Sequence, residues 1–202
     1  MGYFKSPNFN SLKNRFENSK DEKNDRKFLE VVKVALDYFG RSYDAWEKKG
    51  FPSINSSKQD LANFSESVMW IGHSTVLINH KGVTVLTDPH FTERAGPFGM
   101  MGPKRITPPP FAIEDLPKID IILISHNHYD HLDKQSISQL LQNQPQIKFF
   151  VPLGLSPILR SFGATEISEV DWWQSVECGG VKIWSTQVQH WSRRSFFDRN
   201  KT

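Results

Sequence analysis

The chain has 202 residues, of which 38% are hydrophobic and 12% aromatic; this excludes an intrinsically disordered protein and suffices for one domain with a buried core. Its net charge of +3 comes from 25 basic and 22 acidic side chains, a balance too even to indicate a nucleic-acid-binding protein. The single cysteine, Cys178, excludes an internal disulfide framework, and no apolar run is long enough to span a bilayer.

The N-terminal third is predicted to lie outside the core. Residues 1–25 are rich in Asn, Lys and Ser, contain no apolar signal-peptide segment, and are expected to form a flexible leader. Residues 26–41 place Phe, Leu and Val on one helical face, which predicts a helix packed against the domain, with a position on a membrane surface as the alternative. A turn-rich linker is expected to complete a segment over 26–66, so that the core domain occupies 67–202.

Strands are expected to dominate the start of the core domain. Alternating apolar and β-branched residues predict strands over 68–78 and 83–86, joined by a hairpin turn. A Gly/Pro-rich loop over 94–110 follows, and it is expected to form the wall or lid of a site rather than regular structure. The apolar, β-branched run over 119–124 then predicts a buried strand.

Helices and strands alternate through the rest of the chain. Apolar spacing and turn residues predict a helix over 132–141, a strand over 147–151, a helix over 156–162, a strand over 165–170, and a hairpin of strands over 175–177 and 181–186. Strand-rich segments with intervening helices indicate a layered α/β domain.

The densest chemistry lies directly after the strand predicted over 119–124. His126, His128, Asp130 and His131 fall within six positions, and on an extended backbone His126 and His128 point to the same side. Imidazole nitrogens and carboxylate oxygens suit Zn²⁺ or a similar first-row metal. Groups this close could hold two ions, as in two-metal hydrolases, and we favour this interpretation over accidental clustering.

The C-terminal end of the chain brings further candidates. His190 follows the last predicted strand and could supply a third imidazole to an ion held by the motif, which would complete a three-histidine zinc site. Arg194 could clamp a phosphate group or pair structurally with Asp198. Trp172 and Trp173 could line an apolar pocket or form a buried pair under the core.

Other histidines and one carboxylate receive weaker assignments. Asp88 ends a predicted strand and is expected to orient a ligand histidine through a hydrogen bond. His73 lies inside a predicted strand, where a buried histidine bonded to a neighbour is the favoured interpretation. His80 and His90 are expected to be ordinary loop histidines.

The segment from His126 to His131 is similar to the H-x-H-x-D-H signature of the metallo-β-lactamase superfamily. More narrowly, the chain resembles the branch that contains N-acylphosphatidylethanolamine-hydrolysing phospholipase D and its bacterial relatives. The matching segments are W-I-G-H-S-T at 70–75, T-D-P at 87–89, G-P-K-R at 102–105, D-L-P at 115–117, the motif at 125–133, V-P-L-G at 151–154, D-W-W at 171–173, and Q-H-W-S at 189–192 with Arg194. They follow the family's order, so the set is more specific than the motif alone.

The resemblance implies an αββα sandwich with a two-zinc site at one edge. It implies that His126, His128 and His190 bind one Zn²⁺ ion and that Asp130 and His131 bind the other. A metal-bound hydroxide would attack the phosphorus of a phosphodiester, and Asp130 would act catalytically by orienting that nucleophile. His73, Asp88 and Arg194 remain candidates for substrate binding or for orienting the ligands.

The leading functional expectation is a zinc-dependent hydrolase, a phospholipase D-like phosphodiesterase acting on N-acylphosphatidylethanolamine-type lipids. A phospholipid or other phosphodiester is the expected partner, nucleic acid is not, and the oligomeric state is left open. The chain is expected to be cytoplasmic, with peripheral membrane contact left open. One alternative is a small-molecule hydrolase of the same superfamily that acts on a phosphorylated lactone. A nuclease would need a basic groove that the sequence does not indicate.

The chain departs from the family pattern at its C-terminal end. The family has a later Asp that bridges both metals and a distal His that completes the second zinc site, whereas Asp198 is the only carboxylate after His190 here. The sandwich is therefore expected to be C-terminally truncated, with one zinc in this chain and two in the complete site. A non-catalytic remnant that binds a metal or a partner is the further alternative.

Overall fold

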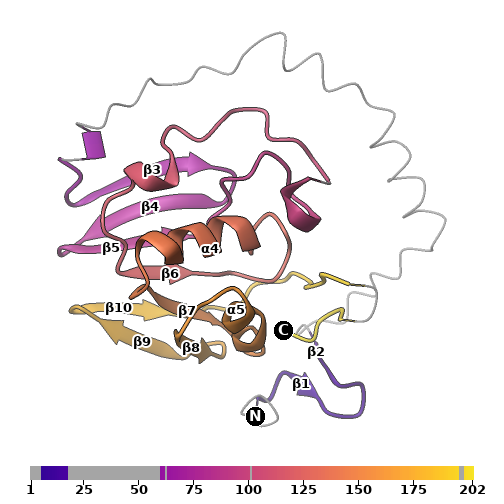
Figure 1. Cartoon of the computed structure of the whole chain (residues 1–202). Coiled ribbons are helices and arrows are strands. Elements are labelled where there is room, and N and C mark those ends of the chain that lie inside the picture. Colours follow the sequence, from indigo (N-terminus) through magenta and orange to yellow (C-terminus); the bar gives the residue numbers. More distant parts are fainter. Residues whose placement is uncertain (1–5, 18–59, 62, 101, 196–197) are drawn as a thin grey trace.

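The computed structural model describes residues 6–17, 60–61, 63–100, 102–195 and 198–202 (Figure 1). The helix expected over 26–41 lies outside the described residues. Within the expected leader, residues 6–17 form a short antiparallel hairpin of β1 (Phe9–Asn10) and β2 (Arg15–Phe16). The backbone N–H of Phe16 donates to the carbonyl oxygen of Asn200, 2.6 Å away, and so joins this hairpin to the C-terminal segment.

A six-stranded sheet with the order β3-β4-β5-β6-β7-β8 organises the described core. Its strands are β3 (Ser67–Gly72), β4 (Thr75–His80), β5 (Val83–Thr87), β6 (Ile121–Leu123), β7 (Lys148–Pro152) and β8 (Glu166–Val170). The first three pair antiparallel, and β5 to β8 pair parallel. The carboxyl ends of parallel strands meet at one edge of a sheet, so the loops that follow β5, β6 and β7 share that edge.

Helices pack over one face of this sheet. They are α4 (Lys134–Asn143) and α5 (Ser156–Ser161), with the short 3-10 helices η2 (Pro97–Gly99) and η3 (Ile113–Asp115) nearby in Figure 1. The carboxylate of Asp133 caps α4 by accepting the backbone N–H of Ser136. Leu140 of α4 is fully buried and belongs to the same apolar cluster as Ile122 of β6 and Phe149 of β7.

The hairpin of β9 (Ser175–Cys178) and β10 (Val181–Trp184) covers part of the opposite face. Ile121 and Phe150 alternate in direction with their neighbours Ile122 and Phe149, and they pack with side chains of this hairpin in a second apolar cluster. Helices, sheet and hairpin therefore form three layers. The layered α/β domain predicted from the sequence is confirmed.

The expectation of one continuous strand over 68–78 is wrong. The chain reverses between β3 and β4, because Gly72 and His73 adopt positive φ angles of 143° and 50°. A positive φ is easy for glycine and uncommon for other residues. The apolar pattern is the same on both sides of the turn, so periodicity alone does not reveal the break.

The loop over 94–110 contains little regular structure, as expected: it holds η2 and an isolated bridge between Arg94 and Lys104. Within the described part of the chain, no helix combines the length and apolar character needed to cross a membrane.

Truncating Leu140 to alanine tests the assigned core. Leu140 has no exposed surface, so Leu140→Ala should lower the free energy of unfolding by about 2–5 kcal/mol through lost burial and the cavity it leaves. Leu12, which is 96% exposed, offers a matched control, and Leu12→Ala should leave stability within about 0.5 kcal/mol of the unmodified chain. Equal urea midpoints for the two variants would contradict this packing.

Candidate metal centre

The histidine motif occupies the loop between β6 and α4, and hydrogen bonds hold that loop at both ends. At its start, the carboxylate of Asp88 accepts the backbone N–H and the hydroxyl of Ser125, each at 2.7 Å. At its end, the backbone N–H of Leu132 donates to the carbonyl oxygen of His128 at 2.8 Å, one turn before α4 begins. The motif side chains therefore lie at the edge of the parallel sheet, on a loop that hydrogen bonds hold in place.

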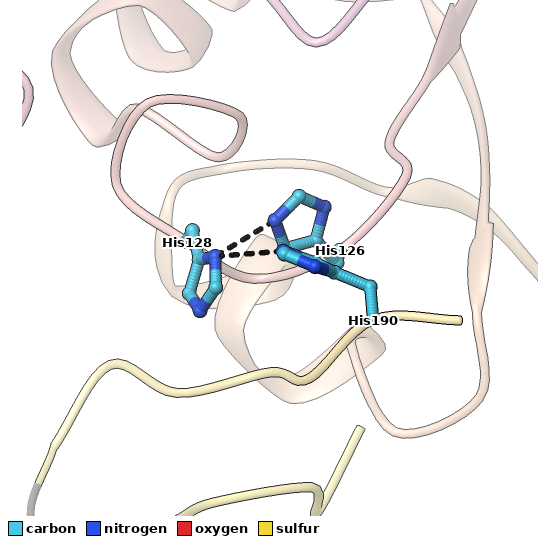
Figure 2. A group of neighbouring side chains, drawn as sticks. All are labelled: His126, His128 and His190. Carbon is cyan, nitrogen blue, oxygen red and sulfur yellow. Dashed lines mark hydrogen bonds between the residues drawn. The ribbon is translucent and has the colours of Figure 1, made fainter. Parts of the chain in front are cut away.

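His126, His128 and His190 meet in front of this loop (Figure 2). Nε2 of His126 lies 2.8 Å from Nδ1 of His128, and Nε2 of His190 lies 3.4 Å from the same Nδ1. His190 comes from the segment after β10, more than sixty residues along the chain. The structure thus brings together the three imidazoles that the sequence analysis grouped, and their role as ligands remains a prediction.

The arrangement of these ring nitrogens fits a bound cation. Nδ1 of His128 has a single lone pair when it is unprotonated, yet two other ring nitrogens face it. Donor atoms about 2.0–2.1 Å from a tetrahedral ion lie about 3.3 Å from one another. The observed separations of 2.8 and 3.4 Å lie on either side of that spacing. An ion that accepts one lone pair from each ring suits this site better than shared protons do.

The surroundings keep these imidazoles neutral, which is the form that binds a metal. Burial, reinforced by the neighbouring His131 and His128, lowers the pKa of His126 to about 3. Burial and the nearby His190 lower the pKa of His128 to about 4. Burial also lowers the pKa of His190. At neutral pH His126, His128 and His190, the histidine trio, therefore offer uncharged nitrogens.

Asp130 and His131, the other two motif residues, lie beside the trio together with His73. The carboxylate oxygen Oδ2 of Asp130 is 2.8 Å from Nε2 of His73 and 3.5 Å from Nε2 of His131. Nδ1 of His131 is 2.8 Å from the carboxylate of Asp88. The expected contact between Asp88 and a motif histidine is therefore present in the structure. Burial opposes the charged form of His131, but its hydrogen bond and attraction to Asp88 outweigh it and raise its pKa.

Arg194 places its guanidinium against the motif loop, and the clamping of a phosphate by this group stays a prediction. Its guanidinium Nη1 donates to the carbonyl oxygens of Asn127 (3.1 Å) and Leu132 (2.6 Å), and the group stacks 4.0 Å above the ring of Tyr129. Asp198 instead accepts the backbone N–H of Arg194 at 3.0 Å. Arg194 thus fastens the motif loop from a distant segment. The sequence motif gave no signal for this contact, because the acceptors are backbone carbonyls.

Two of the other histidine assignments are wrong. His73 is exposed in the turn between β3 and β4, because the predicted strand is broken there. His90 lies in a loop, as expected, but it is buried, and its backbone oxygen and Nδ1 both face the guanidinium of Arg105. Arg105 belongs to the segment G-P-K-R at 102–105, whose sequence gives no signal for this contact. His80 is the last residue of β4 rather than a loop residue, and its exposed side chain places Nδ1 3.0 Å from the carboxylate of Glu66.

A cavity of about 150 Å³ opens beside His126 and His190. Its apolar walls come from the N-terminal hairpin, the loop after β7 and the segments around β9 and β10: Phe16, Leu153, Val170, Trp172, Val188 and Trp191. Trp173 is 65% exposed and does not line this cavity, so the two adjacent tryptophans have different environments. The candidate metal centre therefore borders an aromatic and aliphatic pocket.

Comparison with known proteins places these observations in a family. A family model described as a β-lactamase superfamily domain matches residues 83–202. N-acyl-phosphatidylethanolamine-hydrolyzing phospholipase D 1 of Caenorhabditis elegans is 39% identical over 140 residues, which cover 65% of this chain and 39% of that protein. An uncharacterized protein of Mycobacterium tuberculosis is 41% identical over 138 residues, covering 67% of this chain and 37% of its own length.

Two more distant likenesses complete the comparison. The mitochondrial N-acyl-phosphatidylethanolamine-hydrolyzing phospholipase D of Saccharomyces cerevisiae is 36% identical over 137 residues, covering 66% of this chain and 29% of that protein. A crystal structure of a diiron β-hydroxylase from Streptomyces venezuelae aligns with a TM-score of 0.49 and 29% identity, covering 62% of this chain and 24% of that one. The matched region thus spans 29–39% of the length of these three relatives.

Replacing Arg194 by lysine tests its role in holding the motif loop. Lysine keeps the charge but cannot reproduce the planar guanidinium contact with two carbonyls and an aromatic ring. Arg194→Lys should weaken zinc binding about 10–100-fold, the usual effect of losing a group that supports metal ligands, in a competition titration against a chromogenic chelator. Arg160→Lys, at an exposed position of α5, should bind zinc as the unmodified chain does. Equal zinc affinities for both variants would contradict the assigned role.

Proposed function

We propose that this chain takes part in the zinc-dependent hydrolysis of phosphodiester lipids of the N-acylphosphatidylethanolamine class. The proposal starts from the family, because this chain belongs to the β-lactamase superfamily. Superfamily membership supports metal-dependent hydrolysis in general, and the choice of ion and substrate is the proposal. The observation that carries it is the convergence of three neutral imidazoles beside an apolar cavity. A reactive centre and a place for a lipid chain are thus adjacent.

The side chains of the candidate metal centre would have different roles in such a reaction. His126, His128 and His190 would hold one ion through uncharged nitrogens. A bound Zn²⁺ ion supplies Lewis acidity, which activates water at neutral pH and withdraws charge from phosphoryl oxygens. Burial would raise the pKa of Asp130, but the nearby His131 and His73 lower it overall, so its carboxylate stays ionised. Asp130 can therefore orient the attacking water by accepting a hydrogen bond from it.

The cavity supports an amphiphilic substrate. Trp172 and Phe16 line it with aromatic surface, and Val188 and Trp191 line it while remaining 62% and 41% exposed. Apolar side chains left exposed at the mouth of a pocket suit contact with acyl chains. The activities named for the nematode and yeast relatives involve a lipid of this class. We extend the proposal to peripheral contact of a cytoplasmic chain with the membrane that supplies this lipid.

Metal removal and a ligand substitution test the proposed reaction. Release of phosphatidic acid from N-acylphosphatidylethanolamine in mixed micelles should stop after treatment with a chelator and return with added zinc. His190→Asn should lower this rate at least about 100-fold, because the ion loses one of its three imidazoles. His80→Asn, at an exposed histidine away from the trio, should retain the full rate.

The same assay separates the alternatives to this function. Turnover of a phosphorylated lactone with no turnover of the lipid would replace the proposed substrate by a small molecule. Zinc binding with turnover of neither compound would indicate a non-catalytic metal-binding chain, and the proposed function would then be wrong.

Removing the indole of Trp172 tests the lipid pocket. Trp172→Ala should remove about 1–2 kcal/mol of apolar contact and raise KM for long-chain substrates about 5–30-fold, with kcat nearly unchanged. The adjacent Trp173 is exposed, and Trp173→Ala is a matched control that should leave KM unchanged. If both substitutions shift KM equally, or neither does, the acyl chain binds elsewhere.

A further inference from the structure

The imidazoles of the histidine trio differ in how the ring nitrogen remote from the shared space is supported. His126 and His190 face that space with Nε2, whereas His128 faces it with Nδ1. The remote Nδ1 of His126 lies 2.9 Å from the hydroxyl of Ser125, which donates its own proton to Asp88 and can therefore accept the imidazole proton. His126 thus has a hydrogen-bond partner outside the trio, as metal-binding histidines usually do.

The remote nitrogen of His128 is the exception. When Nδ1 of a neutral histidine binds an ion, the ring proton is on Nε2, and this N–H needs an acceptor. Nε2 of His128 is buried and finds no hydrogen-bond partner among the residues that the structure describes. Figure 2 shows this nitrogen on the side of the ring that points away from His126 and His190. A buried N–H without an acceptor costs free energy, so whatever covers this edge of the ring affects the ligand.

The indole of Trp191 packs against the ring of His128. The two ring centroids are 4.3 Å apart and the ring planes are inclined by 69°, so the edge of one ring meets the face of the other. The Nδ1 edge of His128 is turned to the other two histidines, which leaves the edge that carries Nε2 for the indole. The face of an aromatic ring is negative, and an N–H group directed at it forms a weak hydrogen bond.

Hydrogen bonds of the neighbouring residues hold Trp191 in this position. Ser192 is buried, its backbone N–H donates to the side-chain oxygen of Asn200 at 3.1 Å, and its hydroxyl donates to the carbonyl oxygen of Thr202 at 2.8 Å. The backbone N–H of Asn200 donates in return to the carbonyl oxygen of Ser192 at 2.9 Å. On the other side, His190 belongs to the trio itself. The backbone on both sides of Trp191 is therefore fixed relative to the candidate metal centre.

We propose that Trp191 is a positioning residue of this centre: the face of its indole accepts the Nε2–H of His128 and thereby keeps the lone pair of the ring on Nδ1. A neutral imidazole has one ring proton, so a partner that holds the proton on one nitrogen leaves the other free to bind an ion. An aromatic face would here replace the carboxylate or carbonyl that usually supports a metal ligand. The inference rests on the proposed function only for the bound ion. Because Trp191 also lines the apolar cavity, one side chain would join the ion to the place proposed for the lipid.

Nuclear magnetic resonance of the zinc-loaded full chain tests this contact. Long-range proton–nitrogen correlation spectra distinguish an imidazole protonated on Nε2 from one protonated on Nδ1, and within the trio only His128 should carry its proton on Nε2. The ring current of the indole should move this N–H resonance upfield of the N–H resonance of His126, which is hydrogen-bonded to Ser125. A His128 resonance at or downfield of that position, or a proton on its Nδ1, would overturn the inference.

Substitutions separate the aromatic contact from simple packing. Trp191→Leu keeps an apolar side chain without an aromatic face; it should abolish the upfield shift and weaken zinc binding about 2–10-fold, because the N–H contact with a ring is weaker than a polar support. Trp191→Phe should restore part of the shift and most of the affinity. Trp173→Leu, at an exposed indole outside the cavity, should change neither quantity.

The outcomes distinguish this inference from the proposed function. An unchanged N–H resonance and an unchanged zinc affinity in Trp191→Leu would contradict the role of the indole and leave the proposed hydrolysis standing. Zinc binding with the upfield resonance but without lipid hydrolysis would defeat the proposed function and leave the role of Trp191 intact.

Discussion

The imidazoles of His126, His128 and His190 meet nitrogen to nitrogen at the edge of the parallel sheet, and the rest of the site follows from that constraint. Partial burial and mutual repulsion keep the half-buried pair His126 and His128 unprotonated at neutral pH. Nδ1 of His128 has one lone pair when it is unprotonated, yet ring nitrogens of both His126 and His190 face it, so the arrangement suits a shared cation. The scaffold is best understood as the means of holding these rings together.

Three distant parts of the chain contribute to that task. Asp88, at the end of β5, fixes Ser125 and His131 through its carboxylate. Arg194 reaches back from the C-terminal segment and donates to two carbonyls of the motif loop. The turn between β3 and β4 places Nε2 of His73 2.8 Å from the carboxylate of Asp130 in the motif. The position of the motif side chains therefore depends both on the hydrogen bonds of their loop and on the sheet topology that brings these distant segments together.

The sequence predicted the local chemistry well, because the motif residues are close neighbours in the chain. Most strands, the helices and the layered class also followed from apolar periodicity and turn residues, whereas the parallel pairing of β5 to β8 did not. The break at Gly72 and His73 was missed because both flanking strands share one apolar pattern, although a glycine inside a strand pattern is itself a warning. The role of Arg194 could not be predicted, because its carbonyl acceptors lie 62 and 67 residues away and have no side-chain signature.

X-ray absorption spectroscopy at the zinc edge of the loaded chain is the most direct test of the central claim that converging imidazoles bind the ion. The account predicts only nitrogen and oxygen neighbours at about 2.0–2.1 Å, with the outer-shell scattering of several imidazole rings. A sulfur neighbour at about 2.3 Å, or the absence of imidazole scattering, would contradict it.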